Sequence, residues 1–156
     1  MAASALAGIP AAEAKPAFAM LEMEVADIAL GADGQTFAVL REHDGHKQFA
    51  IRVSRHTAVM MQSAMSGQAF PRPLTYELVL TVIDALGGRC VRAVADADQQ
   101  ALVSPFLEVD APSGMLELAC TLEDAVGIAA CAHVPVMLSD DLLRLLRESR
   151  QPDEPP

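Results

Sequence analysis

Residues 72–77, RPLTYE, bring a cation, two hydroxyl groups and a carboxylate together within six positions. The segment fits the start of a helix, because Thr75 can cap the first turn and Glu77 adds negative charge beside the positive end of the helix dipole. A helix start does not require Arg72, which two flanking prolines hold in an extended segment. The segment is therefore interpreted as a helix start, with Arg72 as the residue that favours a binding site beside it.

The histidines offer a second kind of chemistry. A hairpin closed by Asp44-Gly45 would place His43 opposite His46, where the two imidazoles could chelate a metal ion. Two histidines at an exposed hairpin tip are more often simply solvated, and both interpretations stay open. His56 and His133 have no partner visible in the sequence, and no Ser-His-Asp or Cys-His arrangement can be argued.

Hydrophobic periodicity indicates the elements that must position these groups. Alternation predicts a strand over residues 20–30, followed by a hairpin with a two-residue loop at Asp44-Gly45. That loop would place two apolar pairs on one face of the hairpin, Leu40 with Phe49 and Ala38 with Ile51.

Four helices are expected, and they begin at the capping residues Ser54, Thr75, Thr121 and Ser139. Thr121 and Asp124 have the spacing of a capping box with Asp in place of Glu. The first helix runs to about Ser66 and carries Met60, Met61 and Met65. This methionine stripe is interpreted as adaptable core or as a dimer surface.

Further strands are expected over residues 89–96, 101–109, 115–120 and 134–138. Because proline cannot donate to a ladder, Pro105 predicts that the second of these strands lies at a sheet edge or contains a bulge. The chain is therefore expected to form a single α+β domain with a mixed, largely antiparallel sheet packed against three to four helices.

Composition sets the class of protein. A chain of 156 residues with 52% hydrophobic residues predicts one domain with a real core, and no stretch approaches the roughly 18 apolar residues of a membrane span. The three cysteines have no C-x-x-C spacing, which indicates buried thiols in a reducing compartment and hence the cytoplasm. The folded domain is expected over 20–150, between a disordered Ala/Pro-rich leader (1–19) and a disordered tail (151–156).

The net charge of −10 argues against general binding of nucleic acids, because phosphate contacts require Lys and Arg. Residues 41–92 nevertheless hold seven basic and four acidic side chains, a net charge of +3. This asymmetry permits a local anion-binding face on an acidic protein. Scattered, solvated arginines are the alternative, and the sequence does not decide between them.

Four segments in order resemble the bifunctional nuclease domain family, also known as domain of unknown function 151, over roughly residues 20–146. They are a strand and Ala-rich helix (49–67), an Arg-Pro-x-Thr-His-Asp-Leu motif (72–78), a helix ending in Leu-Gly (79–87), and an Asp-x-Arg-Pro-Ser-Asp-Ala-Ile-Ala-Leu-Ala motif before a Pro-Ile-x-Val strand (119–129 and 134–137). The resemblance implies hydrolysis of phosphodiester bonds in DNA or RNA.

Several polar positions depart from the family pattern. The family has Glu where this chain has Thr57, and its His-Asp pair is Tyr76-Glu77 here. In the later motif only Asp124 is retained, because Ala119, Thr121, Leu122 and Glu123 replace Asp, Arg, Pro and Ser. The scaffold is thus kept while the polar set is thinned.

The resemblance implies a site of three carboxylates that bind Mg²⁺ or Mn²⁺, namely Glu77, Glu123 and Asp124. The same three carboxylates are the candidate catalytic residues. Substrate binding would then involve Arg72, Arg52, Thr75 and Tyr76. Each carboxylate also has a structural interpretation, since acidic residues are common in a first helical turn.

Two hypotheses follow from these residues. A metal-dependent nuclease, active or degenerate, predicts clustered carboxylates with Arg72 beside them and DNA or RNA as partner. A non-catalytic relative that binds a partner or oligomerises predicts separated carboxylates and an apolar face at a two-fold interface. A homodimer or higher homo-oligomer is expected, and no membrane partner.

Overall fold

The structure is a computed structural model that describes residues 19–149. Apart from residue 19, the expected leader and tail lie outside the described residues. The strands are β1 (Met20–Leu30), β2 (Thr36–Glu42), β3 (Gln48–Val53), β4 (Arg89–Ala97), β5 (Val103–Ala111), β6 (Gly114–Ala119) and β7 (Val136–Ser139). The helices are α1 (Arg55–Ser66), α2 (Thr75–Ala85), α3 (Leu122–Ala132) and α4 (Asp140–Glu148).

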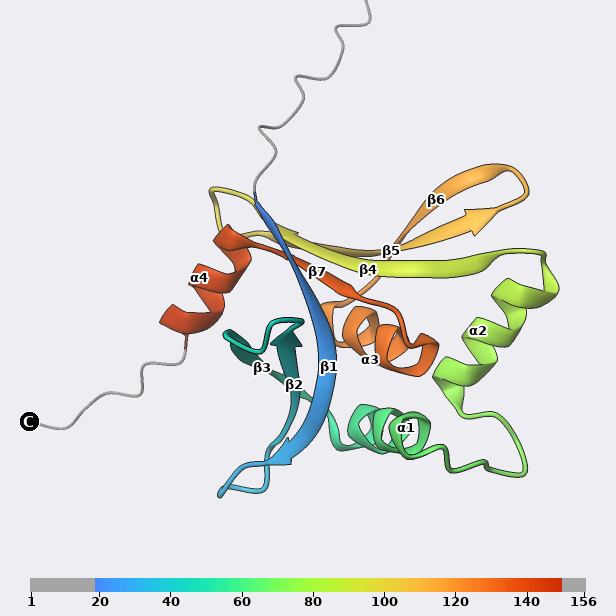
Figure 1. Ribbon diagram of the computed structural model, residues 1–156, viewed down its shortest axis with the longest axis horizontal. Coiled ribbons are helices and arrows are strands. Elements are labelled where there is room, and N and C mark those ends of the chain that lie inside the picture. Colours follow the sequence, from blue (N-terminus) through green and yellow to red (C-terminus); the bar gives the residue numbers. More distant parts are fainter. Residues whose placement is uncertain (1–18, 150–156) are drawn as a thin grey trace, which may run out of the picture.

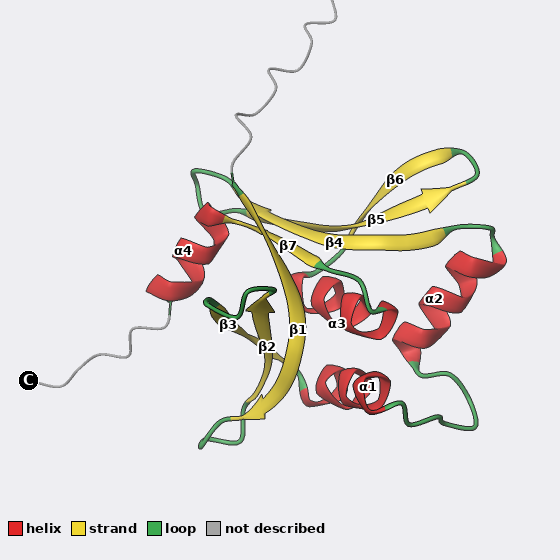
Figure 2. Cartoon of the chain, viewed as in Figure 1, coloured by secondary structure: helices red, strands yellow, loops and turns green. Residues whose placement is uncertain are grey.

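The strands form one seven-stranded sheet in the order β3-β2-β1-β7-β4-β5-β6. Every neighbouring pair is antiparallel except β4 and β7, which run parallel. The expected α+β domain with a mixed, largely antiparallel sheet is therefore confirmed. Figures 1 and 2 show the strongly twisted sheet bending around α3, with α1 and α2 beside that helix. No helix among residues 19–149 is long and apolar enough to cross a membrane.

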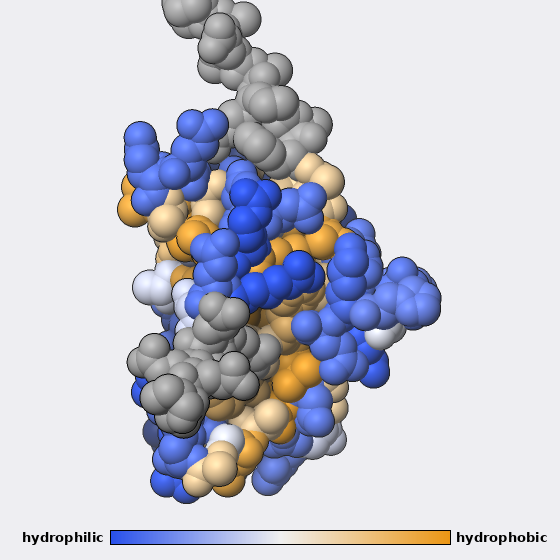
Figure 3. Space-filling model, turned by 90° about the vertical axis from the view of Figure 1, so that its left-hand side faces the viewer, coloured by the Kyte–Doolittle hydropathy of each residue, from blue (hydrophilic) through white to orange (hydrophobic). Residues whose placement is uncertain are grey.

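Small residues let α3 occupy the centre of the core. Ala125, Gly127 and Ala129 are buried along it, and it packs against α1, α2, β4 and β5. Met60 and Met61 of α1 are also buried, which assigns these two methionines to the core. The side of the molecule that carries α4 shows apolar residues between hydrophilic ones (Figure 3).

The hairpin register is confirmed, whereas its loop is longer than expected. Leu40 pairs with Phe49 and Ala38 with Ile51, but the Glu42 N–H bonds the Lys47 carbonyl, which leaves residues 43–46 as the turn. Gly45 supplies the positive φ of +77° that this turn needs. The prediction of a two-residue loop was wrong because the polar residues 43–46 form the turn and do not join the hydrogen-bonded β2–β3 pairing.

The prediction that Thr75 caps α2 was wrong by one residue. Leu74 occupies the N-cap position, and its N–H is satisfied by the Glu77 carboxylate at 2.9 Å. Thr75 is the first helical residue and is exposed. The start of α2 is therefore stabilised by the Glu77 carboxylate, whereas the Thr75 hydroxyl was expected to cap it.

The expectation that Pro105 marks an edge strand or a bulge was also wrong. β5 lies between β4 and β6, and the bulge in β4–β5 pairing falls at Val91. The Pro105 carbonyl accepts from the Cys120 N–H, so the missing N–H of the proline faces the place where β6 has ended. No ladder bond to β4 is lost, which is why an interior strand tolerates the proline.

Candidate functional site

The first turns of α1, α2 and α3 meet at one point, where a chain of hydrogen bonds joins them. The Tyr76 hydroxyl of α2 lies 3.2 Å from Thr57 Oγ1 of α1 and donates to Asp124 Oδ1 of α3 at 2.8 Å. Since the Tyr76 proton is directed at Asp124, Thr57 is the donor to Tyr76. The Thr57 oxygen in turn accepts from the Ser54 hydroxyl at 3.1 Å.

Asp124 uses both of its oxygens in this network. Oδ2 accepts from the Thr121 hydroxyl at 2.8 Å, while Thr121 Oγ1 accepts from the Asp124 N–H at 3.1 Å. The predicted capping pair of Thr121 and Asp124 is thus confirmed. These two hydroxyl hydrogen bonds hold the Asp124 carboxylate in one orientation. Hydrogen bonds linked in such a chain polarise and strengthen one another.

The side chain of Tyr76 is buried in the hydrophobic core. Tyr76 is only 5% exposed, and its ring lies against the α3 backbone at Gly127. Burial, and after it the nearby Asp124 charge, raises the pKa of Tyr76 well above its usual value. The hydroxyl therefore stays protonated and acts as a donor, whereas a free imidazole at this place could exchange protons near neutral pH.

Glu123 connects α3 to the start of α1. Its Oε1 accepts from the Ser54 N–H at 2.8 Å. Burial alone would raise the pKa of the Glu123 carboxyl, but hydrogen bonds, from Ser54 above all, bring it below the usual value. Glu123 is thus ionised and engaged with the backbone at neutral pH.

The three carboxylates expected as metal ligands each have a separate structural partner. Glu77 accepts from Leu74, Glu123 from Ser54, and Asp124 from Tyr76 and Thr121. Within residues 19–149 no group of three or more His, Cys, Asp or Glu side chains lies close enough to hold a metal ion. These residues do not fit a three-carboxylate centre, and binding of Mg²⁺ or Mn²⁺ stays a prediction.

The basic residues divide between two places. Arg52 and Arg55 line a surface pocket of about 470 Å³ together with Ser54 and Glu123. Arg72 is exposed in the loop before α2 and forms no ion pair with another described residue. Of the expected substrate-binding residues, Arg52 therefore lies in the same pocket as Glu123, and Tyr76 lies in the buried network.

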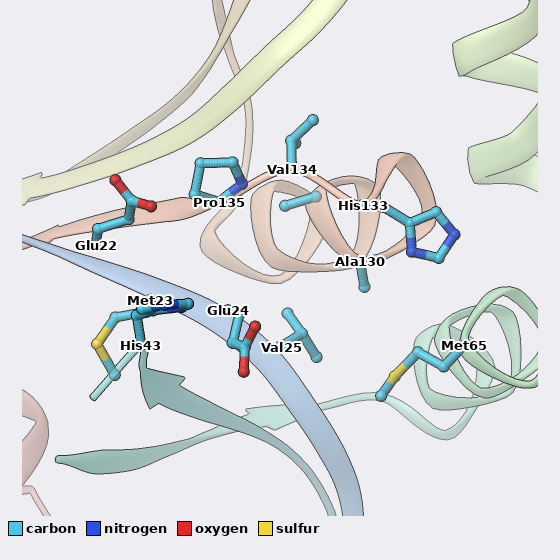
Figure 4. Close-up of a pocket in the computed structure, with 11 residues that line it drawn as sticks. Glu22, Met23, Glu24, Val25, His43, Met65, Ala130, His133, Val134 and Pro135 are labelled. Atoms are coloured by element: carbon cyan, nitrogen blue, oxygen red, sulfur yellow. The ribbon is translucent and has the colours of Figure 1, made fainter. Parts of the chain in front are cut away.

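A second pocket lies between β1 and the end of α3. Figure 4 shows Glu22 and Glu24 of β1, and His133 that follows α3, around a cavity of about 290 Å³. His43 from the hairpin turn also lines it. His46 is absent from this lining, so the pocket does not bring the two histidines of the hairpin turn together, and a metal ion held by His43 and His46 stays a prediction.

Sequence reasoning missed Ser54, Thr121 and Gly127 as parts of the site. Ser54 and Thr121 were predicted as helix caps, and their caps are what place them beside Thr57 and Asp124. Gly127 gave only the weak signal of one more small residue in an Ala-rich helix. The contact between residues 76 and 127 depends on tertiary packing, which no local pattern reveals.

The family model of the bifunctional nuclease domain matches residues 38–150. The chain therefore belongs to the bifunctional nuclease domain family. A search of curated proteins returns no match. The matched region contains the whole network, from Ser54 to Asp124. Thr57 and Tyr76, at the positions where the resemblance places Glu and His, are thus hydrogen-bonded to each other, and Tyr76 is hydrogen-bonded to the retained aspartate.

Proposed function

We propose that this protein is a non-catalytic member of the bifunctional nuclease domain family, in which the domain acts as a binding or oligomerisation module. The observation that carries the proposal is the buried Tyr76 hydroxyl between Thr57 and Asp124. A protonated phenol and a threonine stand where the family pattern supplies an imidazole and a carboxylate.

The hydrogen bonds give the chemical reason. Hydrolysis of a phosphodiester requires a positioned metal ion or a base that activates water. Tyr76 holds its proton, and both Asp124 oxygens already accept hydroxyl hydrogen bonds. The other two candidate carboxylates, Glu77 and Glu123, satisfy backbone N–H groups at helix starts. Each group thus stabilises the fold instead of meeting a substrate.

A second candidate function is metal-dependent hydrolysis of DNA or RNA. It is favoured by the pocket that Arg52, Arg55 and Glu123 share, because two guanidinium groups beside a carboxylate suit a phosphate with its bound cation. In that case Mg²⁺ or Mn²⁺ would recruit Glu123 and the neighbouring Asp124.

A cleavage assay separates the two functions. The purified protein is incubated with single- and double-stranded DNA and RNA in Mg²⁺ or Mn²⁺, with EDTA in parallel. Asp124→Ala and Arg52→Ala variants exclude a contaminating nuclease. We expect no cleavage by the folded protein. Metal-dependent cleavage that both substitutions abolish would overturn the non-catalytic proposal and establish the second candidate.

A further inference from the structure

The β5–β6 hairpin exposes a strand that is apolar and open along one edge. β6 is the last strand of the sheet, and all six of its residues are exposed. Met115 is 57% exposed, and Leu116 and Leu118 are each 41% exposed. A long apolar edge strand is a template for pairing with another strand, and soluble proteins normally protect such edges with charge, proline or a covering element.

The leucines of β6 continue the buried face of the sheet. Leu116 pairs with Val109 and Leu118 with Leu107, and both β5 partners are buried. Paired residues point to the same face, so the two leucines belong to the face that the helices cover. On that face α2, which packs on α3 and β4, adds an exposed apolar stripe of Leu78, Val79, Val82 and Leu86.

The ladder fixes which backbone groups of β6 are free. The Cys120 N–H points to β5, where it bonds the Pro105 carbonyl. Backbone groups alternate in direction along a strand, so those of Met115, Glu117 and Ala119 point to the open edge. β6 therefore presents three unpaired residues with a single charged side chain, Glu117, and no basic group that nucleic acid would require.

We propose that a second copy of this chain pairs its β6 with this β6, antiparallel, about a two-fold axis at Leu116. The proposal rests on the proposed function, since it names the partner that such a module binds. A two-fold axis pairs a strand with itself only in antiparallel orientation. With the axis at Leu116, Met115 and the partner's Glu117 exchange backbone hydrogen bonds.

This register also satisfies charge. An axis at Glu117 would place two carboxylates opposite each other, whereas the axis at Leu116 places each Glu117 opposite a methionine. Each copy carries seven exposed large apolar side chains on these two surfaces, three on β6 and four on the α2 stripe. The dimer would extend the sheet across both copies.

A cysteine cross-link tests the register. Leu116 would face its counterpart with β-carbons about 4.5–5.5 Å apart, close to disulfide geometry. Leu118, equally exposed on the same face, would lie roughly 13 Å from its counterpart. Mild oxidation should therefore yield a covalent dimer of Leu116→Cys but not of Leu118→Cys or of the native chain. Cross-linking of Leu118→Cys with none of Leu116→Cys would overturn the proposal.

Sedimentation equilibrium and light scattering then test the interface itself. We expect the native chain at about twice its 16.5 kDa mass. Glu117→Pro, which removes an outward N–H, should give a folded monomer, whereas Glu117→Ala should remain dimeric. A native chain that is monomeric at every concentration, or a dimer that Glu117→Pro does not dissociate, would show that two copies do not pair through β6. Neither result depends on cleavage, so a nuclease-active dimer would refute the proposed function alone.

Discussion

Gly127 lies so close to Tyr76 that a β-carbon on it would overlap the ring at Cε2 and lie 2.9 Å from Cζ. The phenol occupies the space that a side chain on α3 would need. The family pattern has alanine at this position and histidine at position 76. The larger ring and the missing β-carbon thus fit each other in this chain.

Gly127→Ala is expected to destabilise the protein by about 1–3 kcal/mol, because an added methyl group overpacks the site. At an unconstrained helix position the same change stabilises by about 0.4–1 kcal/mol through reduced unfolded-state entropy. Urea unfolding measures the difference. In the background of Tyr76→His, whose ring is smaller, the penalty should largely disappear. An equal penalty in both backgrounds would show that Gly127 does not serve the phenol.

Tyr76→Phe is expected to destabilise the fold by about 1–3 kcal/mol, since it leaves Thr57 and Asp124 without their buried partner. The ring still fills its place, so the loss isolates the hydroxyl group. A double-mutant cycle with Asp124→Ala, followed by denaturant unfolding, gives the coupling between the two residues. Additive losses would mean that the phenol and the carboxylate do not share a bond.

Glu123 should contribute a pH-dependent share of stability. Its folded-state pKa lies below the reference value of 4.5. The contribution is therefore fully present above about pH 4.5 and is lost as the pH falls through the lower folded pKa. The free energies of unfolding of the native protein and of Glu123→Gln are measured from about pH 3 to about pH 7, a range that spans this loss. The two values should become equal at the acidic end. Glu117→Gln serves as the control, because Glu117 makes no hydrogen bond to another described side chain or backbone group.

Cys131 should be an unreactive thiol in the folded protein. Burial, and then the nearby Glu77 charge, raises the pKa of Cys131 from 9.0 to about 11. Below pH 9 the thiolate fraction of Cys131 is therefore about two orders of magnitude smaller than that of a cysteine with the reference pKa, because each pKa unit is a factor of ten. Iodoacetamide labelling at pH 8, followed by peptide mass spectrometry, measures the rate. Labelling of the native protein as fast as in urea would contradict the raised pKa.

Thr57→Glu combined with Tyr76→His should create affinity for Mn²⁺, because it places a carboxylate and an imidazole beside Asp124. Isothermal titration calorimetry measures the binding, and each single substitution is a control. Binding by the native chain with the same affinity would show that the present residues already form a metal site.

Local patterns predicted most of the fold. The register of the β2–β3 hairpin and the caps Ser54, Thr121 and Ser139 follow from alternation and from short-range hydrogen bonding. Pro105 was misplaced because its cost depends on where β6 ends, a fact of sheet topology. The same limit applies to Thr57, Tyr76 and Asp124: each was noted separately, but only packing of three helix starts brings them into contact.

The place of β7 sets the order in which the protein can be completed during synthesis. This four-residue strand is made almost last, yet it lies between β1 and β4 and forms the one parallel pair among the described strands. Until it leaves the ribosome, two three-stranded antiparallel sheets, β1–β2–β3 and β4–β5–β6, have no strand between them. Nascent chains that end before Val136 would therefore expose both inner edges, and need protection from association until the last strand closes the sheet.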